Sequence, residues 1–385
     1  MNGQNHDQQG YVLLDSVPGE PALWTAEADY LLWIFPNRET SFVGASTKPP
    51  KSVALGTLGD EQLHRHLLTG GQFALGYWYT DSDAMHTRTL RTAGAEVRFF
   101  FLGERSIGFA NDTSPNIVRP FFDLNNHKES GVIVAAPGLA TGGIAALAKG
   151  SFRGAEANLW KNIYHDSIPY NMVSVDVMAG FRYLGLDQDI DIRRATTFLK
   201  DLKAFPEFAG FEKNRIQEGE SFTTRNNFYG GQVGVSGNLF LDKVVLNASA
   251  KLALGTTHEN LSIDGFQVRT LADGTKKASH AALLALPSNI GNHQRNHFAQ
   301  VPELGLKASC PILDHVTFTT GFTALYWSRI ARAGDQIDRG IDITQIPNFP
   351  AAAKATPTGF PRPGVPFDQS SLWVIGANLG LEISW

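Results

Sequence analysis

The stretch Met172-Val-Ser-Val-Asp-Val-Met-Ala-Gly-Phe-Arg-Tyr-Leu184 decides the fold of this 385-residue sequence. Every second residue is apolar, namely Val173, Val175, Val177, Ala179, Phe181 and Tyr183. The residues between them are mostly polar or small, namely Ser174, Asp176, Gly180 and Arg182, with Met172, Met178 and Leu184 as apolar exceptions. A period of two places these sets on opposite faces of a β-strand. The stretch is longer than an ordinary strand and suits a tilted membrane-crossing strand of about 9–11 residues.

The same alternation recurs nine more times along the chain. The other stretches begin near residues 24, 71, 92, 154, 227, 244, 302, 316 and 373. We therefore predict an all-β fold with a single up-and-down antiparallel transmembrane barrel of about ten strands, with twelve as the alternative. The barrel is expected over residues 22–385, and residues 1–21 are expected to form a flexible N-terminal extension.

The connections between these stretches alternate between long and short. The long ones cover about residues 36–70, 103–150, 187–224, 258–297 and 329–370. The short ones cover about residues 80–90, 162–171, 241–243 and 311–315. Long outward loops and short periplasmic turns are typical of bacterial outer-membrane barrels. This pattern predicts a location in the bacterial outer membrane, with outer-membrane lipids as partners.

The tryptophans give a partly independent indication. All seven, namely Trp24, Trp33, Trp78, Trp160, Trp327, Trp373 and Trp385, fall at the ends of the predicted strands. We interpret them as aromatic girdles at the two membrane interfaces, although four of them fall on the polar face by parity. The last strand closes on Trp385, a pattern that resembles the C-terminal sorting signal read by the barrel assembly machinery.

Charged residues in the ten stretches gather on the polar face. They are Glu27, Asp29, Glu96, Arg98, Glu156, Asp176, Arg182, Lys251, Glu303, Lys307 and Glu382. A lipid-facing charge at mid-bilayer costs roughly 2–4 kcal/mol for Arg or Lys, so we predict that these residues face the lumen. Two interpretations stay open. The lumen is either packed with paired charges, or it is a narrow water-filled pore whose acidic excess favours cations.

Composition excludes several other classes of protein. The sequence is 43% hydrophobic, which is enough to form a core. Its longest uncharged run, residues 131–148, is interrupted by Pro137 and Gly138, so no spanning helix is expected. The net charge of −4 without a basic tract argues against nucleic acid as a partner. The single Cys310 excludes an internal disulfide and a cysteine-based zinc site.

The first ten residues, MNGQNHDQQG, have neither the charged region nor the apolar region of a secretory signal. This is consistent with a cytosolic protein or with a chain whose leader has been removed. An outer-membrane location requires the second alternative.

Candidate catalytic and metal sites are weak. Asp187, Asp189 and Asp191 form a ladder that could hold a hard cation but is more typical of a solvated strand. Asp81 and Asp83 lie at a predicted turn. We expect no metal and no cofactor.

A second weak group lies in or beside the fourth predicted loop. His258 and Glu259, with His293 and His297, offer the residue types of general-base chemistry at the outer rim. Without a fixed geometry for them, we expect no enzyme. The fifth predicted loop is rich in proline, namely Pro347, Pro350, Pro357, Pro361, Pro363 and Pro366, which predicts a stiff exposed segment.

Several motifs resemble one family. The motifs run over residues 73–78, 101–106, 119–122, 179–184, 227–232, 284–291, 325–328 and 334–338, and include Ser288-Asn-Ile-Gly291 and Gly334-Asp-Gln-Ile-Asp338. Together they resemble the "BBP" family of bacterial outer-membrane β-barrel proteins over roughly residues 23–385. The resemblance implies an outer-membrane barrel and no agreed activity.

Our hypothesis is an outer-membrane barrel with a structural or narrow-pore, porin-like role and large surface loops. The alternatives are a surface receptor or adhesin that binds an extracellular ligand at its loops, and an outer-membrane hydrolase with its site at the rim.

Overall fold

The computed structural model describes residues 22–35, 67–82, 89–168, 171–241 and 243–385. The predicted N-terminal extension, residues 1–21, lies outside the described residues. Within them, no helix has the length and apolar character needed to cross a membrane.

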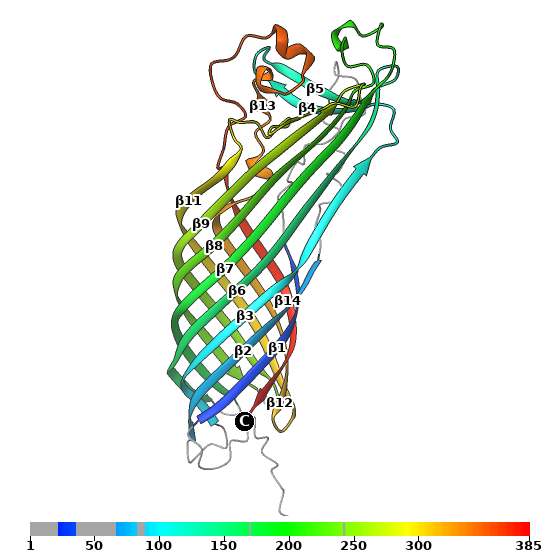
Figure 1. Cartoon of the computed structure of the whole chain (residues 1–385). Helices are drawn as coiled ribbons and strands as arrows, with labels where there is room; N and C mark the ends of the chain where they lie inside the picture. Colours follow the sequence, from blue (N-terminus) through cyan, green and yellow to red (C-terminus); the bar gives the residue numbers. More distant parts are fainter. Residues whose placement is uncertain (1–21, 36–66, 83–88, 169–170, 242) are drawn as a thin grey trace, which may run out of the picture.

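Ten of the described strands form a closed antiparallel barrel (Figure 1). They are β1 (Ala22–Ile34), β2 (Leu67–Ser82), β3 (Thr89–Asn111), β6 (Ala140–Ile168), β7 (Asn171–Phe198), β8 (Arg215–Phe240), β9 (Val245–Thr270), β11 (Gly291–Leu313), β12 (Val316–Ala331) and β14 (Gln369–Ser384). Each strand pairs with the next in chain order, and β1 pairs with β14 to close the ring. The ten-strand, up-and-down prediction is confirmed.

The strands have very different lengths, and this corrects the predicted loops. β1 has 13 residues, whereas β6 has 29 and β7 has 28. β3, β6, β7, β8, β9 and β11 continue as a tall wall beyond the upper ends of β1 and β14 (Figure 1). Much of the predicted loops at 103–150, 187–224 and 258–297 is therefore strand, because alternation continues there with the apolar side turned inward.

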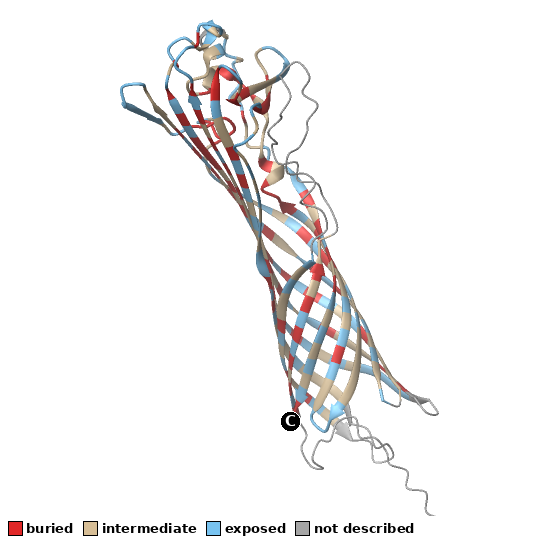
Figure 2. Ribbon diagram, turned by 90° about the vertical axis from the view of Figure 1, so that its right-hand side faces the viewer, coloured by how far each residue is buried: buried red, intermediate tan, exposed pale blue. Residues whose placement is uncertain are grey.

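The lower part of the barrel has an apolar outer face. Its exposed side chains include Phe73, Leu75, Val97, Phe99, Leu159, Phe181, Val233, Leu252, Leu254, Leu304, Leu306, Phe322, Leu379 and Leu381. We call this surface the belt. The alternation of exposed and buried residues along each strand is visible in Figure 2. An apolar surface of this extent requires an apolar medium or a partner.

A small cap covers the concave side of the tall wall. It contains β4 (Ile117–Asp123), β5 (Lys128–Ala135) and the short β13 (Gly340–Ile341), which form a three-stranded sheet. Short 3-10 turns, namely η4 (Gly334–Gln336), η5 (Ile343–Gln345) and η6 (Pro350–Lys354), belong to the last long loop. β10 (Lys276–Ser279) extends the tip of β9, and η3 (Pro206–Phe208) joins β7 to β8.

The cap is held to the wall by an apolar core. Phe121, Val134, Ile192, Phe222 and Leu284 are among its buried members. The proline-rich loop, predicted as an exposed segment, adds Ala333, Ile341, Ile343 and Ile346 to this core. That prediction is wrong in part, since isoleucines just before the first proline, Pro347, are buried against the strands.

Candidate functional site: a lumen closed by its own wall

The eleven charged residues predicted to face the lumen all lie on the inner side of the barrel. Glu27, Asp29, Glu96, Arg98, Asp176, Lys251, Glu303, Lys307 and Glu382 line one cavity of about 290 Å³ in the lower half. Glu156 and Arg182 contact members of this group. The strand periodicity places them there, because each occupies the parity opposite to the belt.

A compact ion-pair layer crosses the middle of the lumen. Arg182 on β7 bonds to both Glu156 on β6 and Glu303 on β11. Lys251 Nζ on β9 lies 3.0 Å from Glu156 and 3.3 Å from Glu303. Gln232 donates to Glu156 at 3.1 Å. Five strands are thereby joined across the interior, since Gln232 lies on β8, and the buried charges neutralise one another.

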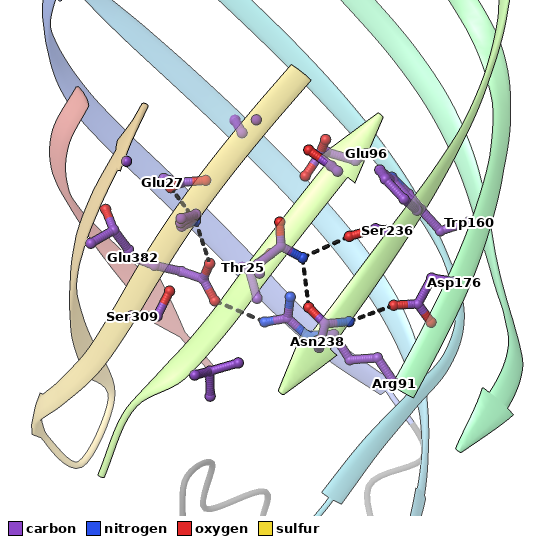
Figure 3. Close-up of a pocket in the computed structure, with 18 of the residues that line it drawn as sticks. Thr25, Glu27, Arg91, Glu96, Trp160, Asp176, Ser236, Asn238, Ser309 and Glu382 are labelled. Atoms are coloured by element: carbon purple, nitrogen blue, oxygen red, sulfur yellow. Dashed lines mark hydrogen bonds and ion pairs between the residues drawn. The ribbon is translucent and has the colours of Figure 1, made fainter. Parts of the chain in front are cut away.

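Below this layer, a second group of charges lines the cavity (Figure 3). Lys307 pairs with Glu27 and lies 3.7 Å from Glu382, which in turn pairs with Arg91 at 2.8 Å. Asp29 accepts from Gln72 at 2.7 Å. The sequence pattern did not predict Arg91, because it lies next to a predicted turn and outside the clear part of the alternation.

Hydrogen-bonded amides form the lowest layer of the cavity wall. Asp176 accepts from Asn162 and from Asn238, both at 2.8 Å. Asn247 donates to Ser236 and to Asn238, both at 2.6 Å. Figure 3 shows Asp176, Ser236 and Asn238 pointing toward one another inside the barrel. Most of the cavity's polar groups therefore already have partners in the wall.

Above the ion-pair layer, apolar side chains fill the cross-section of the barrel. We call this the apolar plug. Its buried members are Leu31, Trp33, Phe100, Leu102, Phe152, Leu184, Leu186, Phe228, Ala253, Ala299, Val301, Leu325, Trp327, Ile330, Leu372 and Val374, with Leu68 packed against them. Each of the ten barrel strands contributes at least one of these residues. Such a layer excludes water and ions as a protein core does.

The plug lies level with the upper edge of the belt. Its members Leu184 and Phe228 are sequence neighbours of Tyr183 and Tyr229, which face outward. The indole of Trp327 is fully buried, and its Nε1 donates to Thr257 at 2.9 Å. Its ring packs edge-on against Phe228, with centroids 6.1 Å apart.

Above the ion-pair layer and the apolar plug, the cap forms a third barrier across the lumen. The cap contains its own buried ion network. Arg119 on β4 bonds to Glu218 at 3.0 Å and to Glu220, both on β8. Arg194 on β7 pairs with Glu218 at 2.6 Å. Burial alone would raise the pKa of the Glu218 carboxyl, but Arg194 and Arg119 together hold it below its usual value. Arg119 was missed because it fell within a predicted loop.

The candidate catalytic residues do not converge. His258 is exposed on the outer face of β9, whereas its neighbour Glu259 is buried inside the barrel and pairs with Arg295 at 2.7 Å. His293 on β11 lies beside Phe367, and its Nε2 lies 3.1 Å from the Asn289 carbonyl. The buried His297 Nε2 has no partner among the described residues. Adjacent residues of a strand point in opposite directions, so His258 and Glu259 cannot share a site.

The aspartate ladder lies on the outer wall above the belt. Asp187 pairs with Arg153 at 2.7 Å, and Asp189 accepts from Thr223 at 2.6 Å. No group of three metal-ligating side chains occurs among the described residues. Asp81 is part of β2, while Asp83 lies outside the described residues.

The girdle interpretation of the tryptophans is wrong for four of the seven. Trp33, Trp78, Trp160 and Trp327 point into the barrel, as their parity indicated, and three of them are buried. Trp24, Trp373 and Trp385 face outward and are exposed. The backbone of Trp385 exchanges hydrogen bonds of 2.9 and 3.0 Å with Trp24, which completes the seam between the first and last strands.

A ten-stranded barrel with a lipid-compatible belt and a polar interior is a β-barrel of the outer-membrane type. The chain belongs to the family described as putative beta barrel porin-7 (BBP7), whose model matches residues 26–385. The resemblance noted from the sequence motifs is confirmed.

Comparisons with solved structures and with curated proteins give weaker similarities than the family model. The chain is similar to the outer membrane protease OmpT from Escherichia coli, with 7% identity, coverage of 94% of this chain and 95% of that chain, and a TM-score of 0.36. It is also similar to a FadL homologue from Pseudomonas aeruginosa, with 8% identity, coverage of 95% and 90%, and a TM-score of 0.22. No curated protein matches the sequence.

Proposed function

We propose that this protein is a structural barrel of the bacterial outer membrane whose lumen is closed and whose cap is presented outside the cell. The apolar plug carries this proposal, because every barrel strand contributes to it. The ion-pair layer below it and the cap core above it reinforce the closure. An open porin needs a continuous polar path, and the plug interrupts that path.

The proposal also assigns the surroundings of the barrel. The belt contacts outer-membrane lipids, and the short turns face the periplasm. The final strand β14, which ends beside the exposed Trp385, is the segment we propose the assembly machinery recognises. We assign no reaction to the chain, since His258 and Glu259 lie on opposite sides of the wall.

The runner-up is a narrow pore, and one observation favours it. The lower cavity contains more carboxylates than cationic groups, so an opened lumen would select cations. A surface receptor is favoured only by the ordered cap, whose loops are packed in a shared core.

Planar-bilayer recording tests the proposal. The wild-type protein is expected to give no steady conductance. The double variant Trp327→Ala, Phe228→Ala removes two rings from the plug and is expected to leak ions. The matched control is Tyr326→Ala, Trp373→Ala, which removes an outward aromatic pair with centroids 4.7 Å apart. Steady, cation-selective steps from the wild type would contradict closure and support the pore.

A further inference from the structure

A group of amide side chains and one histidine lies on the outer wall just above the belt. We call it the amide patch and define it as Asn227 on β8, His258 and Asn260 on β9, and Gln294 and Asn296 on β11. These residues line a hollow of about 610 Å³ in the outer surface, together with Tyr229, Glu259 and Arg295. The side chains of the amide patch occupy the outward parity of their strands, whereas Glu259 and Arg295 pair with each other on the inner side.

An ordered aromatic row forms the lower edge of the patch. The Tyr183 hydroxyl donates to Asn227 Oδ1 at 2.8 Å. The Tyr183 and Tyr229 rings have centroids 5.2 Å apart, and the Tyr229 and His258 rings lie 5.8 Å apart at 71°. These contacts fix the rings before any ligand arrives, which lowers the entropy cost of binding.

The amides above this row have unused hydrogen-bonding capacity. The side chains of Asn260, Gln294 and Asn296 bond to no other described residue. Arg153 and Asp187, also on the outer wall, are by contrast paired with each other at 2.7 Å. Each free amide offers two donor hydrogens and an acceptor oxygen in one plane.

The height of the amide patch on the barrel indicates which part of a lipid it would contact. Phe181 is the next outward residue below Tyr183 on β7, and Val233 is the second outward residue below Tyr229 on β8; both belong to the belt. The patch therefore begins where acyl chains end and headgroups begin. Tyrosine rings are enriched at that boundary in membrane barrels.

We propose that the amide patch binds the saccharide headgroup of a glycolipid in the outer leaflet. This inference rests on the proposed placement in the outer membrane. Sugar rings present C–H faces that stack on aromatic rings, and paired hydroxyls that match the donor and acceptor of an amide. A site for phosphate alone would use arginine forks. Two arginines adjoin the patch among the described residues. Arg225 lies opposite Asn260, and Arg295 lines the hollow but is paired with Glu259 at 2.7 Å.

The test measures glycolipid retained by the purified protein. The full chain is reconstituted in phosphatidylethanolamine vesicles with lipopolysaccharide, re-extracted in mild detergent, and analysed by native mass spectrometry. The triple variant Asn260→Ala, Gln294→Ala, Asn296→Ala and the single variant Tyr229→Ala are expected to retain roughly tenfold less lipopolysaccharide. Tyr229→Phe keeps the ring and is expected to retain the wild-type amount.

The matched control removes polar groups higher on the same wall. Thr141→Ala, Thr197→Ala, Gln217→Ala changes three exposed positions near the upper ends of β6, β7 and β8 and is expected to retain lipopolysaccharide normally. Equal retention by the patch variant and this control would overturn the inference. So would wild-type protein that retains no lipopolysaccharide.

Two further measurements separate the possible failures. Vesicle flotation reports membrane insertion, and protein that does not float contradicts the proposed function. In that case, lipopolysaccharide is titrated into the detergent-solubilised wild type and variants, and their affinities show whether the amide patch binds it. The oligosaccharide released from the same lipopolysaccharide is the last probe, and equal affinity for it would overturn the assignment to a glycolipid.

Discussion

The lower and upper halves of β7 carry the same two-residue alternation with opposite polarity. In the lower half, Val177 and Phe181 face outward while Arg182 faces the lumen. In the upper half, Asp189 faces outward and Ile192 is buried inside. The period identifies the strand in both halves, but the surrounding medium decides which side is apolar.

The two halves are consequently stabilised in different ways. Inside the belt, ion pairs such as Arg182 with Glu156 and Glu303 fill the interior, and hydrocarbon covers the outside. Above the belt, water covers the outside, and apolar burial between wall and cap holds the structure. Substitutions of one chemical kind should therefore have opposite consequences in the two halves.

The largest effect is expected at the ion network of the cap. Arg119→Met leaves Glu220 buried without its cationic partner, while Arg194 still pairs with Glu218. Breaking a buried pair from one side costs about 3–5 kcal/mol. Hydrogen exchange should show β4 and β5 opening while the lower strands stay protected.

A partly exposed ion pair of the cap provides the control. Arg339→Met removes a pair with Glu129 whose side chains are 29% and 39% exposed. Pairs of that kind contribute about 0–1 kcal/mol. Equal exchange in both variants would show that burial of the network does not stabilise the cap.

The next largest effect measures how much apolar burial above the belt contributes to stability. Ile192→Ala empties space in the core between wall and cap and should lower the free energy of unfolding by about 2–5 kcal/mol. The adjacent Asp191→Ala faces outward and should change it by less than about 0.5 kcal/mol. Both are measured by denaturant titration in detergent. Similar values for the two would break the inside–outside assignment of the upper half.

A matched pair of substitutions on β7 compares the two media directly. Ala179 faces outward between the exposed apolar Leu159 and Val233 of the neighbouring strands. Ala179→Arg should cost about 2–4 kcal/mol in lipid vesicles, because the charge meets hydrocarbon.

Ala195→Arg, on the outward parity of the upper half, should stay within about 0.5 kcal/mol. The difference should shrink in detergent solutions that hydrate the belt. If Ala195→Arg costs as much as Ala179→Arg, then both halves contact lipid and the comparison fails.

The belt half could be predicted from the sequence, and the upper half could not. The ten alternating stretches located the barrel, and their polar parity named the charged residues that the structure places inside. On β7, apolar residues keep to the outward face only as far as Tyr183, because the polarity of the alternation reverses from Leu184 onward. The upper strands were then assigned to loops, and Arg119 was hidden with them.

The odd or even position of a residue in its strand also predicts the orientation of the tryptophans and of the His258–Glu259 pair. It placed Trp33 and Trp327 on the inner face, where the structure finds them in the apolar plug. It also separates His258 from Glu259, because neighbours in an extended strand face opposite sides. The plug itself was beyond prediction, since it assembles from single residues of ten strands whose registers the sequence does not specify.

The smallest effect is confined to acid pH and to one loop of the cap. Asp342 accepts bonds from the Asn125 amide at 3.1 Å, the Thr344 hydroxyl at 2.6 Å and the Thr358 backbone N–H at 2.9 Å. Burial opposes ionisation, but these donors hold the pKa of the Asp342 carboxyl below its usual value.

Because the folded-state pKa is depressed, the stabilisation is complete above the unfolded value near about 3.9 and is lost as pH falls below it. Hydrogen exchange over residues 340–358 should therefore be unchanged from neutral pH to about pH 5 and should rise below about pH 4. Asp342→Asn should remove that acid dependence and raise exchange at neutral pH. An acid response that persists in Asp342→Asn would assign the titration to another carboxylate, such as those of the Arg119 network of the cap.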